Sequence, residues 1–471
     1  MARIFVLGLD GAAPKLVFEK WRNQLPNLGK MMREGCFARM KSTIPPSTIV
    51  AWSAFASGRD AGELDVYSYT HRLSRNSDKR KFTDSTCIKK PLMWDILSKK
   101  GLKSNVINVP LTFPAKKING VMVTDFLTPS MKENCVYPKS FKKTLKKIAG
   151  GKDYMFDVGE FTEYKRMPPE KLLQKTREMT EMNFKLIHHL LEKSEWDFFI
   201  AEILGTDRLS HLFWHYFDEK HVRFEKKSKL RNALRDYFIY VDKKIGKLRK
   251  KLPQDTVFIV ASDHGMDRMD GKININDWLI KEGYLSLTKE FAEEAKNGPQ
   301  KLKLSGIDWK KTRAYHIGSY QGRIYINLKG RGRNGIVPEK DFNKIRGELQ
   351  RRLAKIRGSD GRKLKTLFFR PEEIYKNGFG WQCPDLIVYF DNLIYGVNDE
   401  VGNPSFFTLD TLVGKTSAGH SPEGIFLISG PQIKRKGNLG KISILDAAPT
   451  MYKLLGVKAP KDLQGKTINV F

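Results

Sequence analysis

The chain has 471 residues, 40% of them hydrophobic, so it can bury a large core and is longer than one simple domain. It contains no run of about 18 consecutive apolar residues, which excludes a membrane-spanning helix. Lysine and arginine number 84 against 52 acidic residues, and the formal charge of +32 favours phosphate-rich partners. These bases lie on amphipathic helical stretches, so we expect a basic surface and no dedicated nucleic-acid module.

Three β-rich and almost continuously apolar runs each end in an aspartate: "RIFVLGLD", "WDFFIAEILGTD" and "DTVFIVASDH". Continuous apolarity is typical of strands that are buried on both faces of a parallel sheet. Long helical stretches separate these runs, which predicts an α/β fold with a doubly wound, mostly parallel sheet between helix layers. Ligands bind at the carboxyl ends of such strands, so we expect Asp10, Asp207 and Asp263 to meet at one edge.

The segment "IPPSTIVAWSAFASG", residues 44–58, predicts a helix that begins at Ser47 or Thr48 and ends at Gly58. A hydroxyl at a helix N-terminus lies where the macrodipole favours an alkoxide or a phosphate. Ser and Thr are also common caps, and capping is the simpler explanation for this segment alone.

Histidines accompany the later aspartates. "GTDRLSHLFWH" places Asp207 and His211 four residues apart on one helix face, and His215 extends that face by a turn. "ASDHG" offers Asp263 and His264 at a strand end. "AGHSPEGIFLISGP" places His420 before a strand, at the wrong edge of the sheet if that strand is parallel. Either the preceding loop returns His420 to the site, or the strand is antiparallel.

Between residues 286 and 378 the pattern changes to loops, lysine-rich turns, one strand and one helix, which indicates an insertion. We expect residues 1–285 and 379–471 to form the core and residues 286–378 to form a cap. The polar stretch at residues 70–87 is typical of a linker.

Taken together, the aspartates, the histidines and the helix-start hydroxyl form an oxygen and nitrogen ligand set for two divalent ions. Zinc suits it best, with manganese or magnesium as alternatives. Such a cluster can receive an anionic phosphate. The four cysteines lack CxxC spacing, so they indicate neither a zinc knuckle nor a disulfide framework, and a cytoplasmic location fits best.

The motifs "GLDGAAP", "STIPPSTIVAWSAFASG", "TDRLSHLFWHYFD", "ASDHGM" and "AGHSPEGIFLISGP", in this order, resemble the type I phosphodiesterase and nucleotide pyrophosphatase family of the alkaline phosphatase superfamily. The resemblance covers nearly the whole chain and implies an alkaline-phosphatase-like fold with an inserted cap. It implies Thr48 as the nucleophile, which leaves Ser47 as a candidate for the helix cap. The implied ligands of one metal are Asp10, Thr48, Asp263 and His264, and those of the other are Asp207, His211 and His420.

The sequence also departs from the family pattern. After the helix at residues 48–58 it reads "SGRDAGELDVYSYTHR", without the His-Gly of many members or the asparagine of the nucleotide pyrophosphatases. Metal chemistry is therefore better supported than nucleotide specificity. In the predicted cap, Lys329, Arg331 and Arg333 are candidates for contacts with the outer part of a substrate, although a solvated loop explains them equally well.

The sequence thus predicts a two-metal hydrolase that cleaves phosphodiester or pyrophosphate bonds of a small molecule or nucleotide through a phospho-threonine intermediate. One alternative is a phosphomonoesterase or a phosphate-transferring mutase of the same superfamily. An alternative of another class is a catalytically inactive polyanion-binding protein. Clustered carboxylates that repel one another without a metal argue against the inactive protein.

Overall fold

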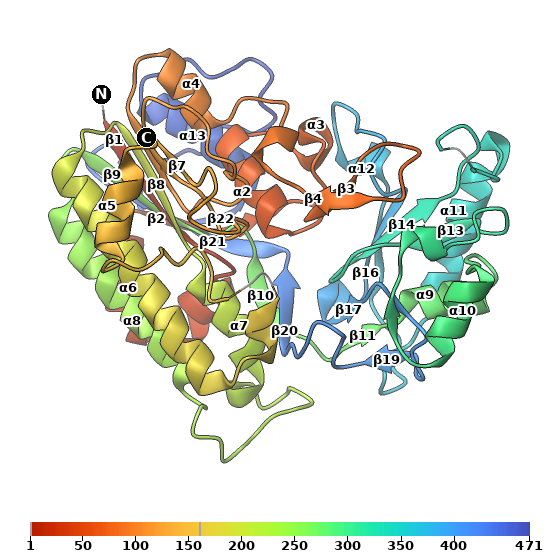
Figure 1. The fold of residues 1–471 in the computed structure, drawn as a ribbon. Coiled ribbons are helices and arrows are strands. Elements are labelled where there is room, and N and C mark those ends of the chain that lie inside the picture. Colours follow the sequence, from red (N-terminus) through yellow and green to blue (C-terminus); the bar gives the residue numbers. More distant parts are fainter. Residues whose placement is uncertain (1, 160–161, 333) are drawn as a thin grey trace. The chain divides into compact units, whose positions relative to one another are not determined.

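The computed structural model describes residues 2–159, 162–332 and 334–471, and the chain in it divides into two compact units (Figure 1). The first unit comprises Met1–Val66, Asp84–Met266 and His420–Phe471. The second comprises Tyr67–Thr83 and Asp267–Gly419. The chain changes unit after Val66 and after Thr83, and again within β10 (Gly265–Arg268) and β20 (Ala418–Ser421).

The described residues of the first unit form a nine-stranded sheet with the order β22-β2-β21-β9-β1-β8-β5-β6-β7. The three strands expected from the sequence lie side by side at its centre, where β1 pairs in parallel with both β8 and β9. Only β21 and β7 run opposite to their neighbours, so the mostly parallel sheet is confirmed. The strands are β1 (Arg3–Leu9), β2 (Cys36–Lys41), β5 (Ser104–Ile107), β6 (Gly120–Val123), β7 (Val136–Tyr137), β8 (Phe198–Ile203), β9 (Thr256–Ala261), β21 (Glu423–Ser429) and β22 (Gly437–Ser443).

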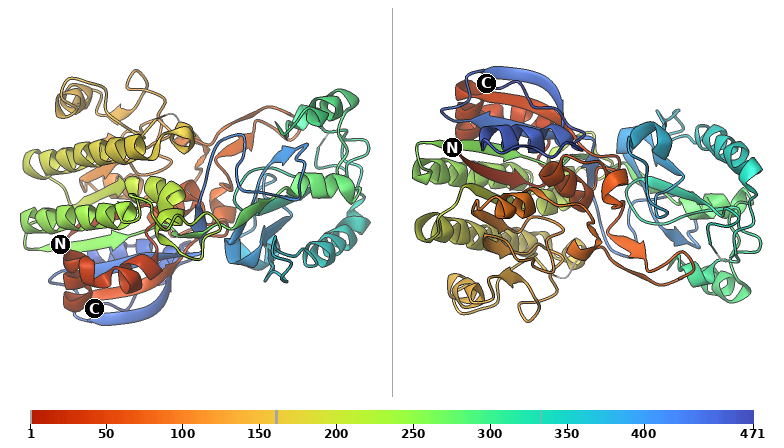
Figure 2. Two further views of the ribbon diagram at one scale, coloured as in Figure 1. Left: turned by 90° about the horizontal axis from the view of Figure 1, so that it is seen from below. Right: turned by 90° about the horizontal axis from the view of Figure 1, so that it is seen from above.

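Helices cover both faces of this sheet, as the views from below and above show (Figure 2). Helices α1, α6, α7 and α8 pack together on one face, and α2, α4 and α13 lie on the other (Figures 1 and 2). Strands β8 and β9 are therefore buried along their whole length, which explains their continuous apolarity. The helices of this unit are α1 (Pro26–Glu34), α2 (Thr48–Ser57), α3 (Ala61–Leu64), α4 (Met93–Lys99), α5 (Phe141–Ile148), α6 (Pro169–Lys193), α7 (Gly205–Phe217), α8 (Ala233–Lys251) and α13 (Ala447–Leu454).

The direction of β21 resolves the position of His420. Strand β21 pairs antiparallel with β9, so its first residues lie at the edge where β9 ends. His420 precedes β21 by three residues and therefore reaches the carboxyl edge of the parallel strands. Of the two explanations left open by the sequence, the antiparallel strand is correct.

The second unit contains a four-stranded antiparallel sheet, β13-β14-β16-β15, and a hydrophobic core of its own. The predicted insertion at residues 286–378 lies within this unit. Residues 70–82, which the sequence suggested as part of a linker, instead form the hairpin β3–β4 of the same unit. Its elements are β3 (Thr70–Arg72), β4 (Arg80–Phe82), β11 (Gly271–Ile273), β12 (Gln300–Lys301), β13 (Ala314–His316), β14 (Gly322–Ile326), β15 (Leu367–Phe369), β16 (Leu386–Tyr389), β17 (Tyr395–Val397), β18 (Glu400–Val401), β19 (Phe407–Thr408), α9 (Ile275–Lys281), α10 (Lys289–Lys296), α11 (Glu339–Leu353) and α12 (Pro371–Ile374).

None of the helices in the described ranges combines the length and the apolarity that a membrane crossing needs.

Candidate metal and nucleophile site

The carboxyl edge of the central strands carries a buried cluster of acidic and imidazole side chains. Asp10 follows β1, Asp263 and His264 follow β9, and Asp207 and His211 belong to the first turns of α7, which begins just after β8. Thr48 is the first residue of α2. The structure thus brings together every residue that the sequence predicted as a ligand: Asp10, Thr48, Asp207, His211, Asp263, His264 and His420, each at most 5% exposed.

One half of the cluster surrounds Thr48. The Nε2 atom of His264 lies 3.1 Å from Thr48 Oγ1 and 3.1 Å from Asp263 Oδ2. It also lies 3.7 Å from Asp10 Oδ1. Trp52 Nε1, one turn further along α2, donates to Asp10 Oδ2 at 3.0 Å and fixes the orientation of that carboxylate.

The other half is built on α7. His211 Nε2 lies 3.3 Å from Asp207 Oδ1 and 3.3 Å from His420 Nε2. His420 Nε2 is itself 3.6 Å from Asp207 Oδ1. The rings of His420 and His264 stack at 3.7 Å, so the two halves adjoin.

The donor atoms fit divalent cations. Two groups within the cluster have atoms close enough to hold a metal ion, Asp10 with Asp263 and His264, and Asp207 with His264 and His420. One carboxylate oxygen of each aspartate is buried without a hydrogen-bond donor, and these are Asp10 Oδ1, Asp207 Oδ1 and Asp263 Oδ2. A buried, unsatisfied carboxylate oxygen is costly unless a cation satisfies it.

The imidazole tautomers point to the same chemistry. His264 Nδ1 lies 3.0 Å from the carbonyl oxygen of Gly265, and His420 Nδ1 lies 2.8 Å from that of Pro46. A carbonyl only accepts, so both Nδ1 atoms carry the proton and both Nε2 atoms present a lone pair to the cluster. A backbone partner of this kind orients a metal-binding histidine.

The electrostatics show a shortage of positive charge. Burial, and then the charge of Asp207, raise the pKa of Asp10 well above its usual value, and burial with the charge of Asp10 does the same for Asp263. Burial opposes the ionisation of Asp207, but His211 and Arg208 outweigh it and hold the pKa of that carboxyl well below its usual value. Burial lowers the pKa of His264 to about 4, so its ring is neutral.

Sequence reasoning missed several residues beside the cluster. Glu202 on β8 is buried, and burial followed by the charges of Asp10 and Asp263 raise its pKa well above the usual value. A single acidic residue in the apolar run "FFIAEIL" was a visible signal for it. Arg208 donates to Asp207 Oδ2 at 2.9 Å and, through Nε and Nη2, to Asp157.

Lys165 is a further cation near this site. It lies in the short helical turn Glu163–Arg166 and is 8% exposed. Burial, together with the charge of Arg208, lowers its pKa to about 8, while the charge of Asp207 acts in the opposite direction. The neighbouring Tyr164 packs its ring 6.4 Å from that of His211. No spacing in the sequence links this turn to α7, so only the fold reveals it.

Other predicted candidates lie outside the cluster. His215 Nε2 lies 3.8 Å from Glu225 Oε1. In the second unit Lys329 is exposed, and the guanidinium of Arg331 donates to both oxygens of Asp385 at 2.8 and 2.6 Å. Arg333 lies outside the described residues. The assignment of these three basic residues to substrate contacts stays a prediction.

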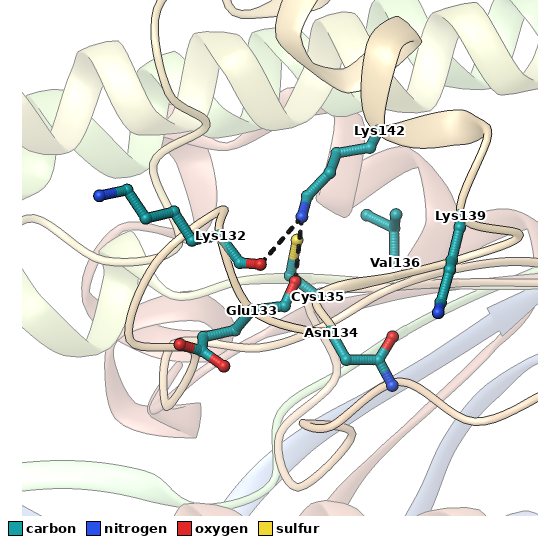
Figure 3. A pocket seen from close by; sticks show the side chains of 7 residues that line it. All are labelled: Lys132, Glu133, Asn134, Cys135, Val136, Lys139 and Lys142. Carbon is teal, nitrogen blue, oxygen red and sulfur yellow. Dashed lines mark hydrogen bonds between the residues drawn. The ribbon is translucent and has the colours of Figure 1, made fainter.

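The first unit also contains a pocket of about 280 Å³ beside β7, at the far edge of the sheet (Figure 3). Its lysines include Lys142, whose Nζ already donates to the backbone oxygens of Lys132 and Glu133 at 3.3 and 3.1 Å. The pocket contains none of the predicted ligands, and we assign it no role in the chemistry. It is lined by Lys132, Glu133, Asn134, Cys135, Val136, Lys139 and Lys142.

Comparisons with known proteins identify similar folds and sequences. Residues 4–404 match the family model of type I phosphodiesterase/nucleotide pyrophosphatase, a range that ends before His420. The structure of human ectonucleotide pyrophosphatase/phosphodiesterase 5 is similar with a TM-score of 0.55 and 12% identity, covering 97% of this chain and 96% of that chain. An inactive threonine-to-alanine variant of the murine protein, in complex with AMP, is similar with a TM-score of 0.56 and 14% identity, covering 98% and 96%. No curated protein matches this chain by sequence.

The close approach of β1 to α2 generates a prediction about Gly8. A Cβ atom at Gly8 would lie 2.5 Å from Cη2 of Trp52, whose ring is fully buried. We expect Gly8→Ala to lower the free energy of unfolding by about 1 to 3 kcal/mol, measured by urea unfolding, as overpacked cores do. Gly29→Ala is the control, because its Cβ would meet only the flexible end of Arg33, at 3.4 Å. Equal stability of the two variants would contradict the tight packing of Trp52.

Proposed function

The chain belongs to the type I phosphodiesterase/nucleotide pyrophosphatase family and is a hydrolase, and from this premise we propose that it cleaves phosphodiester or pyrophosphate bonds with Thr48 as nucleophile. The observation that carries the proposal is the position of Thr48 Oγ1, which lies 3.1 Å from His264 Nε2 at the edge of the acidic cluster. The proposed substrate is a nucleotide or another small phosphate ester.

The local structure of α2 supports a chemical role for Thr48. Ser47 occupies the N-cap position, yet its side chain makes no capping hydrogen bond, and Thr48 is already inside the helix. The common reason for a hydroxyl at this point, which is to cap the helix, therefore does not apply to Thr48. The N-terminus of α2 also favours the negative charge of a phosphoryl group.

We propose that Asp10, Thr48, Asp263 and His264 hold one divalent ion and that Asp207, His211 and His420 hold a second. The oxygen and nitrogen donors suit zinc best, and manganese and magnesium are alternatives. When bound, two such ions supply positive charge that favours the Thr48 alkoxide and the transferred phosphoryl group. The unsatisfied oxygens of Asp10, Asp207 and Asp263 support this assignment.

The proposed reaction has two displacements at phosphorus. Thr48 Oγ gives its proton to solvent and attacks phosphorus, the bond from phosphorus to the leaving group breaks, and the leaving group departs with the electron pair. Water then attacks the phospho-threonine, the bond from phosphorus to Thr48 Oγ breaks, and a proton released by the attacking water restores the Thr48 hydroxyl. Trp52 keeps Asp10 oriented throughout through its hydrogen bond of 3.0 Å.

The murine neighbour adds support for both parts of the proposal. It is inactive when one threonine is replaced by alanine, and it binds AMP. We propose that Thr48 has the corresponding role here and that the substrate contains a nucleotide-like phosphate. The four cysteines of this chain are thiols, none of them in a disulfide, which is consistent with a reducing, cytoplasmic location.

A phosphomonoesterase or mutase is the second candidate, and Lys165 favours it. A monoester is a dianion, and Lys165 supplies a cation near Asp207 that the sequence did not reveal. Arg208 adds little positive charge for binding a dianion, because it already forms ion pairs with Asp157 and Asp207. We retain the diester assignment, since one buried lysine is a small counter-charge for a dianion.

The nucleophile is tested by substitution. Thr48→Ala should lower kcat by at least about a thousandfold, because the attacking oxygen is removed, and Thr48→Ser should retain part of the rate. Steady-state hydrolysis of bis-4-nitrophenyl phosphate measures both. Ser47→Ala is the matched control and should stay near the wild-type rate, since its hydroxyl makes no cap. Near-normal turnover by Thr48→Ala would exclude the covalent mechanism.

The metal assignment is tested by elemental analysis. We expect about two divalent ions per chain, and loss of activity with a strong chelator that zinc or manganese reverses. Asp207→Asn and Asp10→Asn should each lower the occupancy of a different site. His215→Ala, on the same helix as Asp207 but outside the cluster, is the control and should leave the metal content unchanged. The assignment would be disproved if the protein contained no metal and its activity were unchanged by chelators.

The substrate class is tested by comparing two nitrophenyl esters. We expect kcat/KM to be higher for the diester bis-4-nitrophenyl phosphate than for the monoester 4-nitrophenyl phosphate, because a nearly neutral site suits a singly charged group. Lys165→Gln should then affect both esters to a similar extent. A preference for the monoester that Lys165→Gln abolishes would instead support the phosphatase or mutase.

A further inference from the structure

One face of the sheet in the second unit carries basic and phenolic side chains. Tyr315 on β13 is directly opposite Tyr325 on β14, and their rings stack at 5.3 Å with an angle of 18°. Arg323 precedes Tyr325 by two residues and therefore points to the same face. Ile324 and Ile326, on the opposite face, belong to the hydrophobic core of the unit. Tyr315 is also a member of this core, and Tyr325 packs against it.

The hairpin β3–β4 adds two more arginines. Arg72 and Arg80 are directly opposite each other across the hairpin. Like charges in this position destabilise a strand pair. The hairpin contacts the sheet region through Arg72 N, which donates to Gln382 Oε1 at 2.8 Å, and Arg323 Nη1 donates to the carbonyl oxygen of Tyr67 at 3.2 Å.

Neutral oxygens, and no carboxylate, hold these guanidinium groups in place. Arg80 donates to the hydroxyl and carbonyl oxygens of Thr70 at 2.7 to 3.1 Å, and Arg72 donates to the backbone oxygens of Ser77 and Arg75 at 2.9 and 2.8 Å. Arg323, only 4% exposed, donates to Ile317 and Tyr67 carbonyls. In the part of the chain that the structure describes, none of the three forms an ion pair with an acidic residue.

The nearest acidic groups do not neutralise this charge. Asp385 is occupied by Arg331 and by the backbone N–H of Ile326. Asp399 attracts Arg80 and Arg323 but forms no ion pair with either. Burial and the nearby arginines lower the pKa of Arg80 and of Arg323. The charge is thus partly buried and uncompensated, which an anion would relieve.

The tyrosines supply the second feature of a binding site. Tyr315 is 94% buried, since only 6% of it is exposed, and its hydroxyl has no hydrogen-bond partner among the described residues. Burial raises the pKa of Tyr315 to about 12, although Arg72 opposes the shift. The hydroxyl therefore remains a donor beside the arginines. Tyr325 is partly buried, and burial raises its pKa against the charges of Arg323 and Arg80.

We propose that Arg72, Arg80, Arg323, Tyr315 and Tyr325, here called the arginine–tyrosine site, bind a phosphate group of a small organic ligand. Three guanidinium groups and two hydroxyls supply hydrogen-bond donors from the hairpin and from the sheet. These donors outnumber the hydrogen bonds that the two oxygens of a carboxylate accept. A phosphate has several acceptor oxygens and up to two negative charges. The site lies wholly within the second unit and does not rest on the proposed function.

Protection from arginine modification tests the site in the wild-type chain. Phenylglyoxal labelling followed by mass spectrometry reports each arginine separately, so phosphate bound elsewhere does not interfere. With inorganic phosphate at roughly ten times its Kd, labelling of Arg72 and Arg80 should slow by about tenfold. Arg75, exposed at the tip of the same hairpin, is the internal control and should show no protection. Equal protection of all three arginines, or of none, would overturn the proposal.

Variants give an independent readout by calorimetry. Arg72→Gln combined with Arg80→Gln should weaken one phosphate-binding event by at least about tenfold, while Arg75→Gln should leave it unchanged. The change to glutamine keeps the stem and removes the like-charge pair, so the fold of the hairpin should persist. Unchanged phosphate affinity in the double variant, or equal protection of Arg72 by acetate, would disprove a phosphate site.

Discussion

The mutual repulsion of buried carboxylates is the constraint on which the first unit depends. Asp10 follows β1, Asp263 follows β9, and Asp207 lies in the helix that follows β8. Because these three strands are parallel, all three aspartates lie at the same edge of the sheet. Burial strengthens their repulsion, because little solvent screens it. Arg208 and His211 hold the pKa of Asp207 well below its usual value, whereas the pKa values of Asp10 and Asp263 stay well above theirs, although Arg208 also acts on Asp10. The acidic groups that are left uncompensated make this edge suited to cations.

The antiparallel strand β21 completes this receptor. A sheet with only parallel strands could supply residues that follow strands, as Asp10 and Asp263 do, but not a residue that precedes one. Because β21 runs against β9, His420 reaches the same edge from the opposite direction along the chain. Its imidazole then links Asp207 and His211 to His264. A single reversed strand thus unites the two halves of the cluster.

Much of this arrangement was predictable from the sequence, and the exceptions have physical reasons. The central strands are continuously apolar, and each is followed by its aspartate, so both the parallel sheet and the acidic edge could be inferred. The hairpin β3–β4 could not, because its strands are three residues long and rich in arginine, which is typical of a loop. Lys165 was also missed, since its approach to α7 depends on tertiary packing alone.

The distribution of charge explains how a strongly basic chain can contain an acidic centre. The formal charge of +32 attracts anionic molecules over long range, whereas the carboxylates are buried and contribute little to the outer field. In the second unit a basic side chain is also buried: Arg323 has no carboxylate partner in the described ranges. One unit therefore buries negative charge that fits cations, and the other buries positive charge that fits anions. A phosphate group is compatible with both preferences, because it binds both to cations held by carboxylates and directly to arginine.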